Sequence, residues 1–224
     1  MTEKWEPFVV EHVPEGVNES APLLVFLHGF GADERDLLPI ASMLPEQFIV
    51  MSVRAPLELG FGGYAWFPLS SQDLEFNSAD YSQVVEDLTE WVVERKKQHE
   101  TVTLVGFSQG MAMATSVARR DPSAVDALVG LSGFTLEQFA DDAGEDFFKD
   151  EELASREEKM PMFWGRDPED PVIPDRFIEP TNTWARANTD LTKVNYQGIG
   201  HGVGQTEIRH IGEFLTAKVL GAQV

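Results

Sequence analysis

Short apolar runs alternate with longer amphipathic segments along nearly the whole chain. This alternation is typical of a mainly parallel β-sheet with helices covering both of its faces. Seven apolar runs rich in β-branched residues are expected to be the strands. They are residues 8–12, 23–27, 48–53, 102–105, 127–131, 161–164 and 192–196. The sequence therefore predicts an α/β protein.

The amphipathic segments between these runs are expected to be helices. The strongest pattern covers residues 80–98, where apolar residues recur every three or four positions with charges between them. Further helices are expected after Ser108, Pro174 and Gly204. The acidic stretch 140–159 is expected to be a solvated excursion between two strands.

The length of 224 residues and a hydrophobic fraction of 42% suit one domain covering residues 1–224. No apolar stretch approaches the roughly 20 residues that a membrane-spanning helix needs. The first residues show no basic head followed by an apolar run, so no secretory signal is expected and a cytoplasmic location is predicted.

The formal net charge is −21, from 38 acidic and 17 basic residues. Such a charge repels nucleic acid and anionic lipid surfaces, which are therefore not expected as partners. The acidic residues form either a solvated coat or an adaptation to high salt, and the sequence leaves both interpretations open.

The chain contains no cysteine, which excludes disulfides, thiolate metal sites and a cysteine nucleophile. Its histidines are scattered without the spacing of a metal site, so neither a metal nor another cofactor is expected.

The sequence Gly106-Phe107-Ser108-Gln109-Gly110 stands between a predicted strand and a predicted helix. This is the context of a nucleophile elbow, a sharp turn that raises a serine hydroxyl above the edge of a sheet. The flanking positions must be glycine because no side chain fits there. Ser108 is therefore the predicted nucleophile.

A second turn, His28-Gly29-Phe30-Gly31, follows the predicted strand 23–27. In such folds it supplies an oxyanion donor, so the backbone N–H groups of Phe30 and Gln109 are the predicted donors. Because only the backbone donates, both side chains are expected to be free to vary. His28 precedes the serine, against the chain order Ser, acid, His, and is expected to brace the turn.

The general base is expected on the loop after the last predicted strand, where His201 lies. The rival His210 falls within an amphipathic helix and is expected to pack or to face solvent. The acid that orients the base is expected on the loop after strand 161–164. Asp170 is preferred there, with Asp167 as the alternative.

Together these motifs resemble the phospholipase/carboxylesterase family of α/β-hydrolases, which includes the acyl-protein thioesterases. The matching residues, in family order, are Leu27 to Gly31, Arg54-Ala55-Pro56, Trp66-Phe67, Gly106 to Gly110, Asp170-Pro171-Val172-Ile173-Pro174 and His201-Gly202. The resemblance implies an α/β-hydrolase fold, a triad of Ser108, Asp170 and His201, and oxyanion donors at Phe30 and Gln109. Two departures are Trp164-Gly165, where members often have His-Gly, and Trp66-Phe67-Pro68, where they often have Trp-Phe-Asp.

The segment 57–69 is too apolar for a merely solvated connector and is predicted to wall an acyl pocket. A packing role is the alternative for Trp66. The candidate pocket residues are Phe61, Tyr64, Trp66, Phe67, Phe134 and Trp164. No excursion is long and apolar enough to be a large lid, which favours short- to medium-chain esters over long-chain triacylglycerols.

The leading functional hypothesis is a serine carboxylesterase that acts on a small-molecule ester through an acyl-enzyme. An acyl-protein thioesterase or a lysophospholipase is the nearest alternative, because the same site attacks thioesters and lipid esters. A catalytically silent protein that binds a small ligand is the hypothesis from another class. A homodimer is left open.

Overall fold

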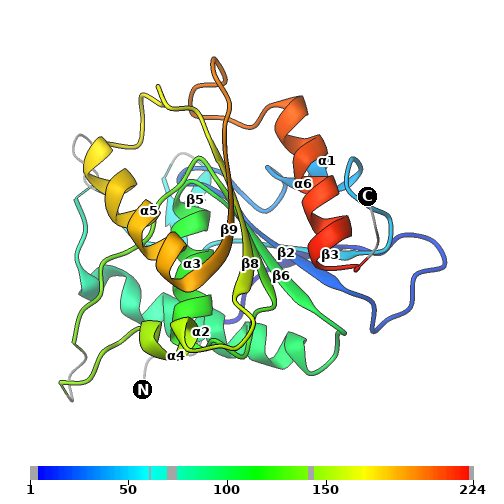
Figure 1. Ribbon diagram of the computed structural model, residues 1–224, viewed down its shortest axis with the longest axis horizontal. Helices are drawn as coiled ribbons and strands as arrows, with labels where there is room; N and C mark the ends of the chain where they lie inside the picture. The colour runs from blue at the N-terminus through cyan, green and yellow to red at the C-terminus, as the bar shows by residue number, and fades with distance from the viewer. Residues whose placement is uncertain (1–4, 61, 70–74, 141–143, 222–224) are drawn as a thin grey trace.

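In the computed structural model, which describes residues 5–60, 62–69, 75–140 and 144–221, seven strands form one sheet (Figure 1). Their order is β1-β3-β2-β6-β7-β8-β9. Only β1 runs antiparallel to its neighbour, and every other pair is parallel. The strands are β1 (Val9–His12), β2 (Leu23–Leu27), β3 (Ile49–Val53), β6 (Val102–Phe107), β7 (Ala127–Leu131), β8 (Met160–Arg166) and β9 (Thr189–Asn195). The predicted mainly parallel sheet is confirmed.

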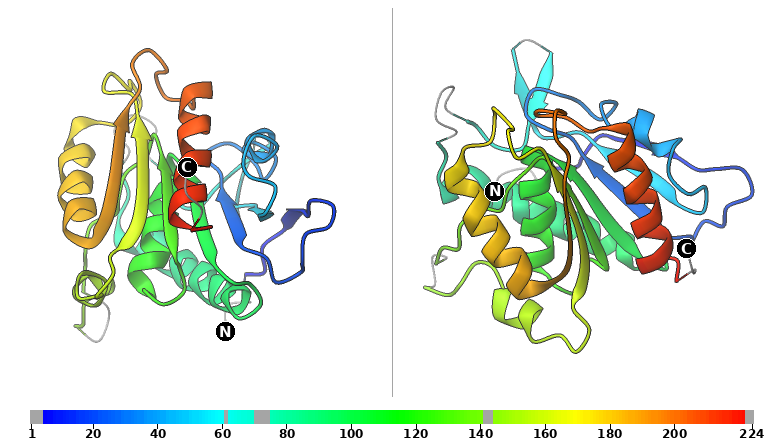
Figure 2. Two further views of the ribbon diagram at one scale, coloured as in Figure 1. Left: turned by 45° about the vertical axis from the view of Figure 1, so that its right-hand side comes forward. Right: turned by 45° about the horizontal axis from the view of Figure 1, so that its top comes forward.

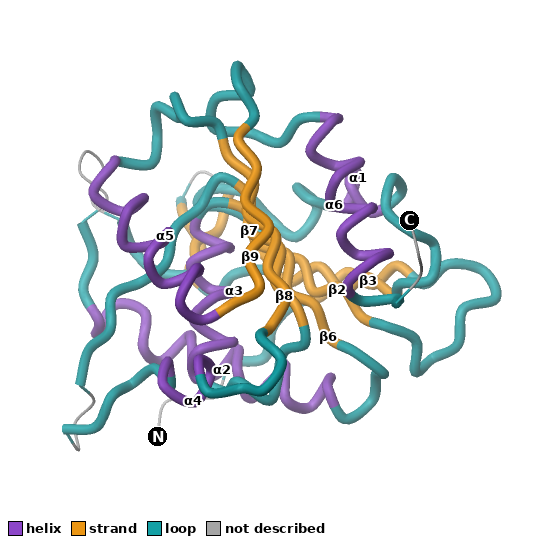
Figure 3. The backbone as a smooth tube through the Cα atoms, viewed as in Figure 1, coloured by secondary structure: helices purple, strands orange, loops and turns teal. Residues whose placement is uncertain are grey.

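Helices cover both faces of the sheet (Figure 3). They are α1 (Leu38–Ala41), α2 (Ser78–Lys96), α3 (Gln109–Arg120), α4 (Asp150–Ala154), α5 (Asp175–Asn188) and α6 (Gln205–Lys218). One apolar core lies between the sheet and α2, α3, α4 and α5, and a second lies between the sheet and α1 and α6. Among the described helices, none is both long enough and apolar enough to cross a membrane.

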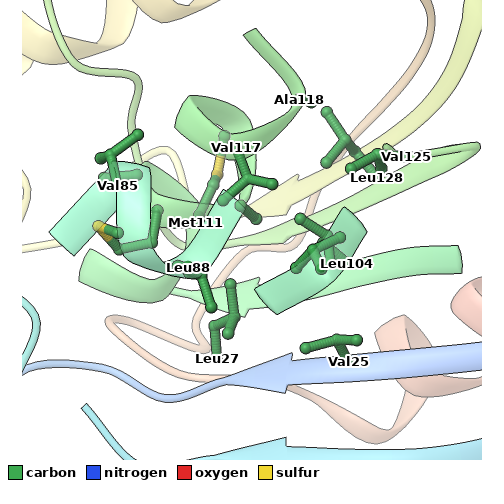
Figure 4. Close-up of a cluster of buried hydrophobic side chains, with 14 of the residues drawn as sticks. Val25, Leu27, Val85, Leu88, Leu104, Met111, Val117, Ala118, Val125 and Leu128 are labelled. Carbon is green, nitrogen blue, oxygen red and sulfur yellow. The ribbon is translucent and has the colours of Figure 1, made fainter. Parts of the chain in front are cut away.

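The larger core is built around α3, which packs against both α2 and the sheet. Every residue from Gln109 to Arg119 is buried. In this core Leu27, Leu104 and Leu128 of three neighbouring strands face Leu88 of α2 and Met111 of α3 (Figure 4). Burying leucine-sized side chains stabilises a fold by about 2 kcal/mol each, so this layer holds the start of α3 firmly against the sheet.

A β-hairpin that the sequence did not predict lies within the apolar segment 57–69. Its strands, β4 (Leu57–Leu59) and β5 (Gly63–Ala65), pair antiparallel and project from the main sheet (Figure 2). The hairpin is bound to the turn after β2: Gly31 N–H donates to the Tyr64 carbonyl, and Tyr64 N–H donates to the Ala32 carbonyl, both at 2.8 Å. A Cβ on Gly63 would collide with the Gly31 carbonyl, so the close approach requires glycine.

The acidic stretch 140–159 is not simply solvated, although residues 141–143 lie outside the described part of the chain. It contains α4, and the side chains of Phe147, Phe148 and Leu153 are buried. The carboxylate of Asp150 binds the buried guanidinium of Arg119 at 2.8 and 2.7 Å. The prediction of a solvated excursion is wrong here, because apolar side chains and one buried ion pair fix the segment to the core.

Candidate active site

Ser108 lies in a sharp turn between β6 and α3. Its backbone has φ 54° and ψ −117°, a strained conformation for a residue with a side chain. A Cβ on Gly106 would collide with the backbone of Gly110, and a Cβ on Gly110 would collide with the Leu27 carbonyl. Gly106 therefore allows the chain to turn as tightly as a nucleophile elbow requires, and Gly110 allows the start of α3 to approach the end of β2.

His201 lies between Ser108 and Asp170 and is hydrogen-bonded to both. Its Nε2 is 2.9 Å from Ser108 Oγ, and its Nδ1 is 2.8 Å from Asp170 Oδ2. A carboxylate can only accept hydrogen bonds, so Nδ1 of His201 carries the proton. Its Nε2 is then free to accept a hydrogen bond from the serine hydroxyl. The three side chains follow β6, β8 and β9, whose carboxyl ends lie at one edge of the sheet.

The Asp170 carboxylate is fixed by the chain that follows it. Its Oδ1 accepts the backbone N–H groups of Val172 at 2.8 Å and Ile173 at 3.3 Å, which leaves Oδ2 directed at His201. Of the two candidate acids, Asp170 is the one that contacts the imidazole.

Asp167, the alternative acid, binds backbone groups instead. It accepts the N–H of Glu169 at 3.0 Å and that of Gly200 at 2.8 Å. These hydrogen bonds, first Glu169 and then Gly200, hold the pKa of the Asp167 carboxyl below its usual range. Through these two hydrogen bonds, the buried side chain links the loop that carries Asp170 to the loop that carries His201.

Among the described hydrogen bonds, His210 and His28 make none with Ser108 or Asp170. His210 is on α6, where its Nδ1 is 2.8 Å from the hydroxyl of Tyr196. His28 is buried, and burial lowers the pKa of its imidazole. Its Nε2 accepts the Ala55 N–H at 3.1 Å, and its Nδ1 lies 2.8 Å from the Gly29 carbonyl. His28 thus ties the turn after β2 to the segment after β3, as expected.

The predicted oxyanion donors belong to two backbone segments in close contact. Phe30 follows β2, Gln109 is the first residue of α3, and Gly110 is packed directly against the Leu27 carbonyl. The first N–H groups of a helix have no acceptor within the helix and carry a partial positive charge. This arrangement suits an anion beside Ser108.

The side chain of Gln109 is not free to vary, contrary to expectation. It is buried; its Oε1 accepts the Trp66 N–H at 2.9 Å, and its Nε2 donates to the Phe67 carbonyl at 2.8 Å. Removing it would leave two buried backbone groups unpaired. Phe30, by contrast, is 40% exposed.

Most of the predicted pocket residues are packed in the interior. Each of Trp66, Phe67, Phe134 and Trp164 exposes no more than 2% of its surface. The Trp66 indole N–H donates to the His28 carbonyl at 2.9 Å, so Trp66 has the packing role considered as its alternative. These burials give no support to an acyl pocket walled by the four rings.

Tyr64, another predicted pocket residue, lies in the hairpin strand β5. The ring of half-buried Tyr64 is 4.6 Å from the guanidinium carbon of Arg54. Arg54 in turn binds the buried carboxylate of Glu34 at 2.6 and 2.8 Å. Phe61 lies outside the described residues.

Exposed apolar side chains around the site were not predicted. Phe30, Leu57 and Val172 are 40%, 38% and 44% exposed. Phe30 is in the oxyanion turn, Val172 is two residues past Asp170, and Leu57 is in the hairpin bound to the oxyanion turn. The sequence could have indicated Phe30 and Val172, because each is an apolar residue within a motif of the predicted site.

A cavity of about 770 Å³ lies between the start of α2, residues 137–139 and the start of α5. Its lining includes Phe76 and Phe177, whose rings stack at 5.8 Å, and both rings contact Phe134. Phe134 follows Gly133, which packs against the backbone of Ser108. The cavity lining is thus linked to the serine turn through Phe134 and its neighbour Gly133.

Known proteins share the fold of this chain. The model of the family described as Phospholipase/Carboxylesterase matches residues 9–219. The carboxylesterase of Bacillus cereus superposes with a TM-score of 0.74 at 21% identity, covering 95% of this chain and 94% of that one. Acyl-protein thioesterase 2 of Zea mays superposes with a TM-score of 0.70 at 19% identity, covering 95% and 99%. At these identities the two structures show a shared fold.

A curated protein of Oryza sativa subsp. japonica, named probable 1-acylglycerol-3-phosphate O-acyltransferase, is 28% identical over 134 residues. The match spans 59% of this chain and 30% of that protein, so the chain corresponds to less than a third of this relative. The family model, in contrast, covers nearly all of the chain. The chain therefore belongs to the phospholipase/carboxylesterase family of α/β-hydrolases, a family of ester hydrolases.

Proposed function

We propose that the protein is a serine carboxylesterase that hydrolyses short- to medium-chain carboxylic esters through an acyl-enzyme. The observation that carries the proposal is the chain of hydrogen bonds from Ser108 through His201 to Asp170, at 2.9 and 2.8 Å. A hydroxyl, an imidazole and a fixed carboxylate in this geometry are what nucleophilic attack on a carbonyl needs.

In the first half-reaction, Ser108 Oγ attacks the ester carbonyl carbon while His201 Nε2 takes the hydroxyl proton. The N–H groups of Phe30 and Gln109 bind the oxyanion, where one such donor is worth about 3 kcal/mol in the transition state. The tetrahedral intermediate then expels the alcohol, which takes the proton from His201. Asp170 stabilises the imidazolium throughout.

In the second half-reaction, water replaces the alcohol. His201 accepts a proton from the water as it attacks the acyl-enzyme, and Ser108 leaves with that proton when the carboxylic acid is released. The apolar side chains of Phe30, Leu57 and Val172 around the site suit the acyl chain of an ester, since apolar contact removes both surfaces from water.

The proposal is tested by hydrolysis of p-nitrophenyl esters from acetate to palmitate, with wild type, Ser108→Ala and Asp170→Asn. We expect Ser108→Ala to lower kcat more than about 1,000-fold. Asp170→Asn is expected to lower kcat about 10,000-fold, because an amide can hold the imidazole in the wrong tautomer. Activity is expected to peak at short or medium chains. Unchanged hydrolysis by Ser108→Ala would refute the proposal.

An acyl-protein thioesterase or lysophospholipase is the second candidate, favoured by the likeness to the Zea mays acyl-protein thioesterase 2 fold. Matched oxygen esters and thioesters of one acyl chain separate these activities, with lysophosphatidylcholine as the lipid arm. The wild-type protein could instead hydrolyse none of these substrates and resist labelling by a serine-directed fluorophosphonate. This result would favour the hypothesis of a catalytically silent protein that binds a small ligand.

A further inference from the structure

We propose that Asp167 is a positioning residue that holds the loop of His201 in register with Asp170. This inference rests on the proposed function, because it assigns how the acid and the base of that site are kept together. Among the described residues, no hydrogen bond joins Asp167 to Ser108 or to the imidazole, so its effect is transmitted through the backbone.

The first argument is the position of the Asp167 carboxylate between two loops. Its Oδ1 accepts the N–H of Glu169, the residue before Asp170, at 3.0 Å. Its Oδ2 accepts the N–H of Gly200, the residue before His201, at 2.8 Å. One side chain thus fixes the backbone immediately before the acid and immediately before the base.

The second argument is the conformation of the receiving loop. Gly198 and Gly200 have φ values of 82° and 59°, the left-handed region that favours glycine. In this conformation the N–H groups of residues 198–200 turn toward one point, as in the backbone nests that bind anions. All three N–H groups help to lower the pKa of Asp167, so the loop is built around a negative charge.

The third argument is the place of the Asp167 bond among the contacts that hold this loop. Ser132 Oγ donates to the Gly202 carbonyl at 3.0 Å, and Gly204 N–H lies 3.3 Å from the carboxylate of Glu207. Both contacts are on the far side of His201. On the near side, Ile199 packs against the smaller apolar core, Tyr196 N–H donates to the Arg166 carbonyl at 2.9 Å, and the bond from Gly200 to Asp167 is the hydrogen bond nearest to His201. A shift of about 1 Å in a catalytic group can cost roughly 100-fold in rate.

The test compares Asp167→Asn with Asp126→Asn as a matched control. Asp126 also accepts a backbone N–H, from Val102 at 2.7 Å, but lies at the amino end of β6 and β7, at the opposite edge of the sheet. We expect Asp167→Asn to lower kcat roughly 10- to 100-fold with KM little changed. The acid limb of its pH–rate profile is expected to shift to lower pH, because a looser Asp170 stabilises the imidazolium less.

The control is expected to lose stability while keeping both kcat and the pH profile of the wild type. Wild-type kcat and an unmoved acid limb in folded Asp167→Asn would overturn the proposal. If Asp167→Asn gives no folded protein, Asp167→Glu replaces it: this variant keeps the charge but displaces the carboxylate by one methylene. A lowered kcat in Asp167→Glu supports the proposal, and a wild-type kcat overturns it.

A spectroscopic measurement separates this inference from the proposed function. The proton on His201 Nδ1 is expected to give a low-field NMR resonance that disappears in Asp170→Asn. In Asp167→Asn we expect this resonance to broaden or shift, whether or not the protein turns over esters. If the wild type is inert but the resonance responds, the proposed function fails and the positioning role stands. An unperturbed resonance in Asp167→Asn would refute the positioning role alone.

Discussion

The side-chain amide of Gln109 accepts a hydrogen bond from the backbone N–H of Trp66, with its Oε1 2.9 Å from that nitrogen. The same amide donates to the Phe67 carbonyl at 2.8 Å. Trp66 in turn donates its indole N–H to the carbonyl of His28, in the turn that supplies the proposed oxyanion donor. Gln109, the residue after the proposed nucleophile, is therefore linked to the proposed oxyanion turn through its side chain.

Gln109→Ala is expected to lower both stability and activity. It leaves a buried N–H and a buried carbonyl unpaired, at a cost of about 1–3 kcal/mol each in the free energy of unfolding. We also expect kcat/KM to fall about tenfold as the oxyanion turn loosens. Urea unfolding and ester hydrolysis measure the two effects. The control is Gln83→Ala, whose side chain makes one exposed bond to Asp87 and is expected to change neither.

Glu207 is expected to make stability depend on pH. Its side chain is fully buried; Oε2 accepts the Gly204 N–H at 3.3 Å, and Oε1 has no hydrogen-bond partner among the described residues. Burial raises the pKa of this carboxyl from 4.5 to about 7. The folded state therefore favours the protonated form, and its stability relative to the unfolded state falls as pH rises from about 4.5 to 7.

The loss from this one group is about 3 kcal/mol across that range, since each pKa unit corresponds to about 1.4 kcal/mol. Glu207→Gln removes the titration, so its free energy of unfolding should exceed that of wild type increasingly as pH rises. Urea unfolding at several pH values measures this difference. Parallel curves for the two proteins would contradict the prediction, and Glu213→Gln, an exposed change on the same helix, is the control.

Arg119 is expected to be the ion-pair residue with the greatest effect on stability. Its guanidinium binds both oxygens of Asp150, donates to the Leu136 carbonyl at 2.6 Å and lies 3.9 Å from the Phe148 ring centroid. Arg119→Met leaves these partners without their cation and is expected to cost about 3–5 kcal/mol.

The matched control is Arg209→Met. Arg209 pairs with Glu213 at 2.7 Å, but both side chains are about half exposed, so the loss is expected to stay below about 1 kcal/mol. Urea unfolding of both variants gives the comparison. Equal losses would show that burial of the Arg119 pair does not set its contribution.

Salt is expected to stabilise the protein. With 38 acidic and 17 basic residues, the folded chain repels itself, and raising the ionic strength from 0.1 to 1 M shortens the screening length from about 10 to 3 Å. The urea midpoint should therefore rise with KCl. A flat or falling midpoint would favour the solvated acidic coat over salt adaptation.

The sequence predicted the sheet well because its strands are parallel and buried on both faces. Such strands appear as continuous apolar runs, as in β2 (Leu23–Leu27) and β7 (Ala127–Leu131), where all five residues are buried. The residues of the site were predictable for the same reason. Ser108, Asp170 and His201 each follow a strand that the pattern marks, and the carboxyl ends of parallel strands meet at one edge.

What the sequence missed depends on contacts between distant segments. The hairpin strands have three residues each, too short for an alternating pattern, and their place is fixed by Gly31 and Ala32, about 30 residues earlier. The role of the Gln109 side chain depends on backbone more than 40 residues earlier. Periodicity carries no information about such partners.

The separation of Ser108 and His201 along the chain also has a consequence for biosynthesis. They are 93 residues apart, and His201 follows β9, an edge strand of the sheet and the last of the described strands in chain order. A nascent chain that has emerged only through α5 already carries the serine and the aspartate, but its serine has no partner to take up a proton. The hydrogen-bonded arrangement of Ser108, His201 and Asp170 can therefore form only after residue 201 has been synthesised.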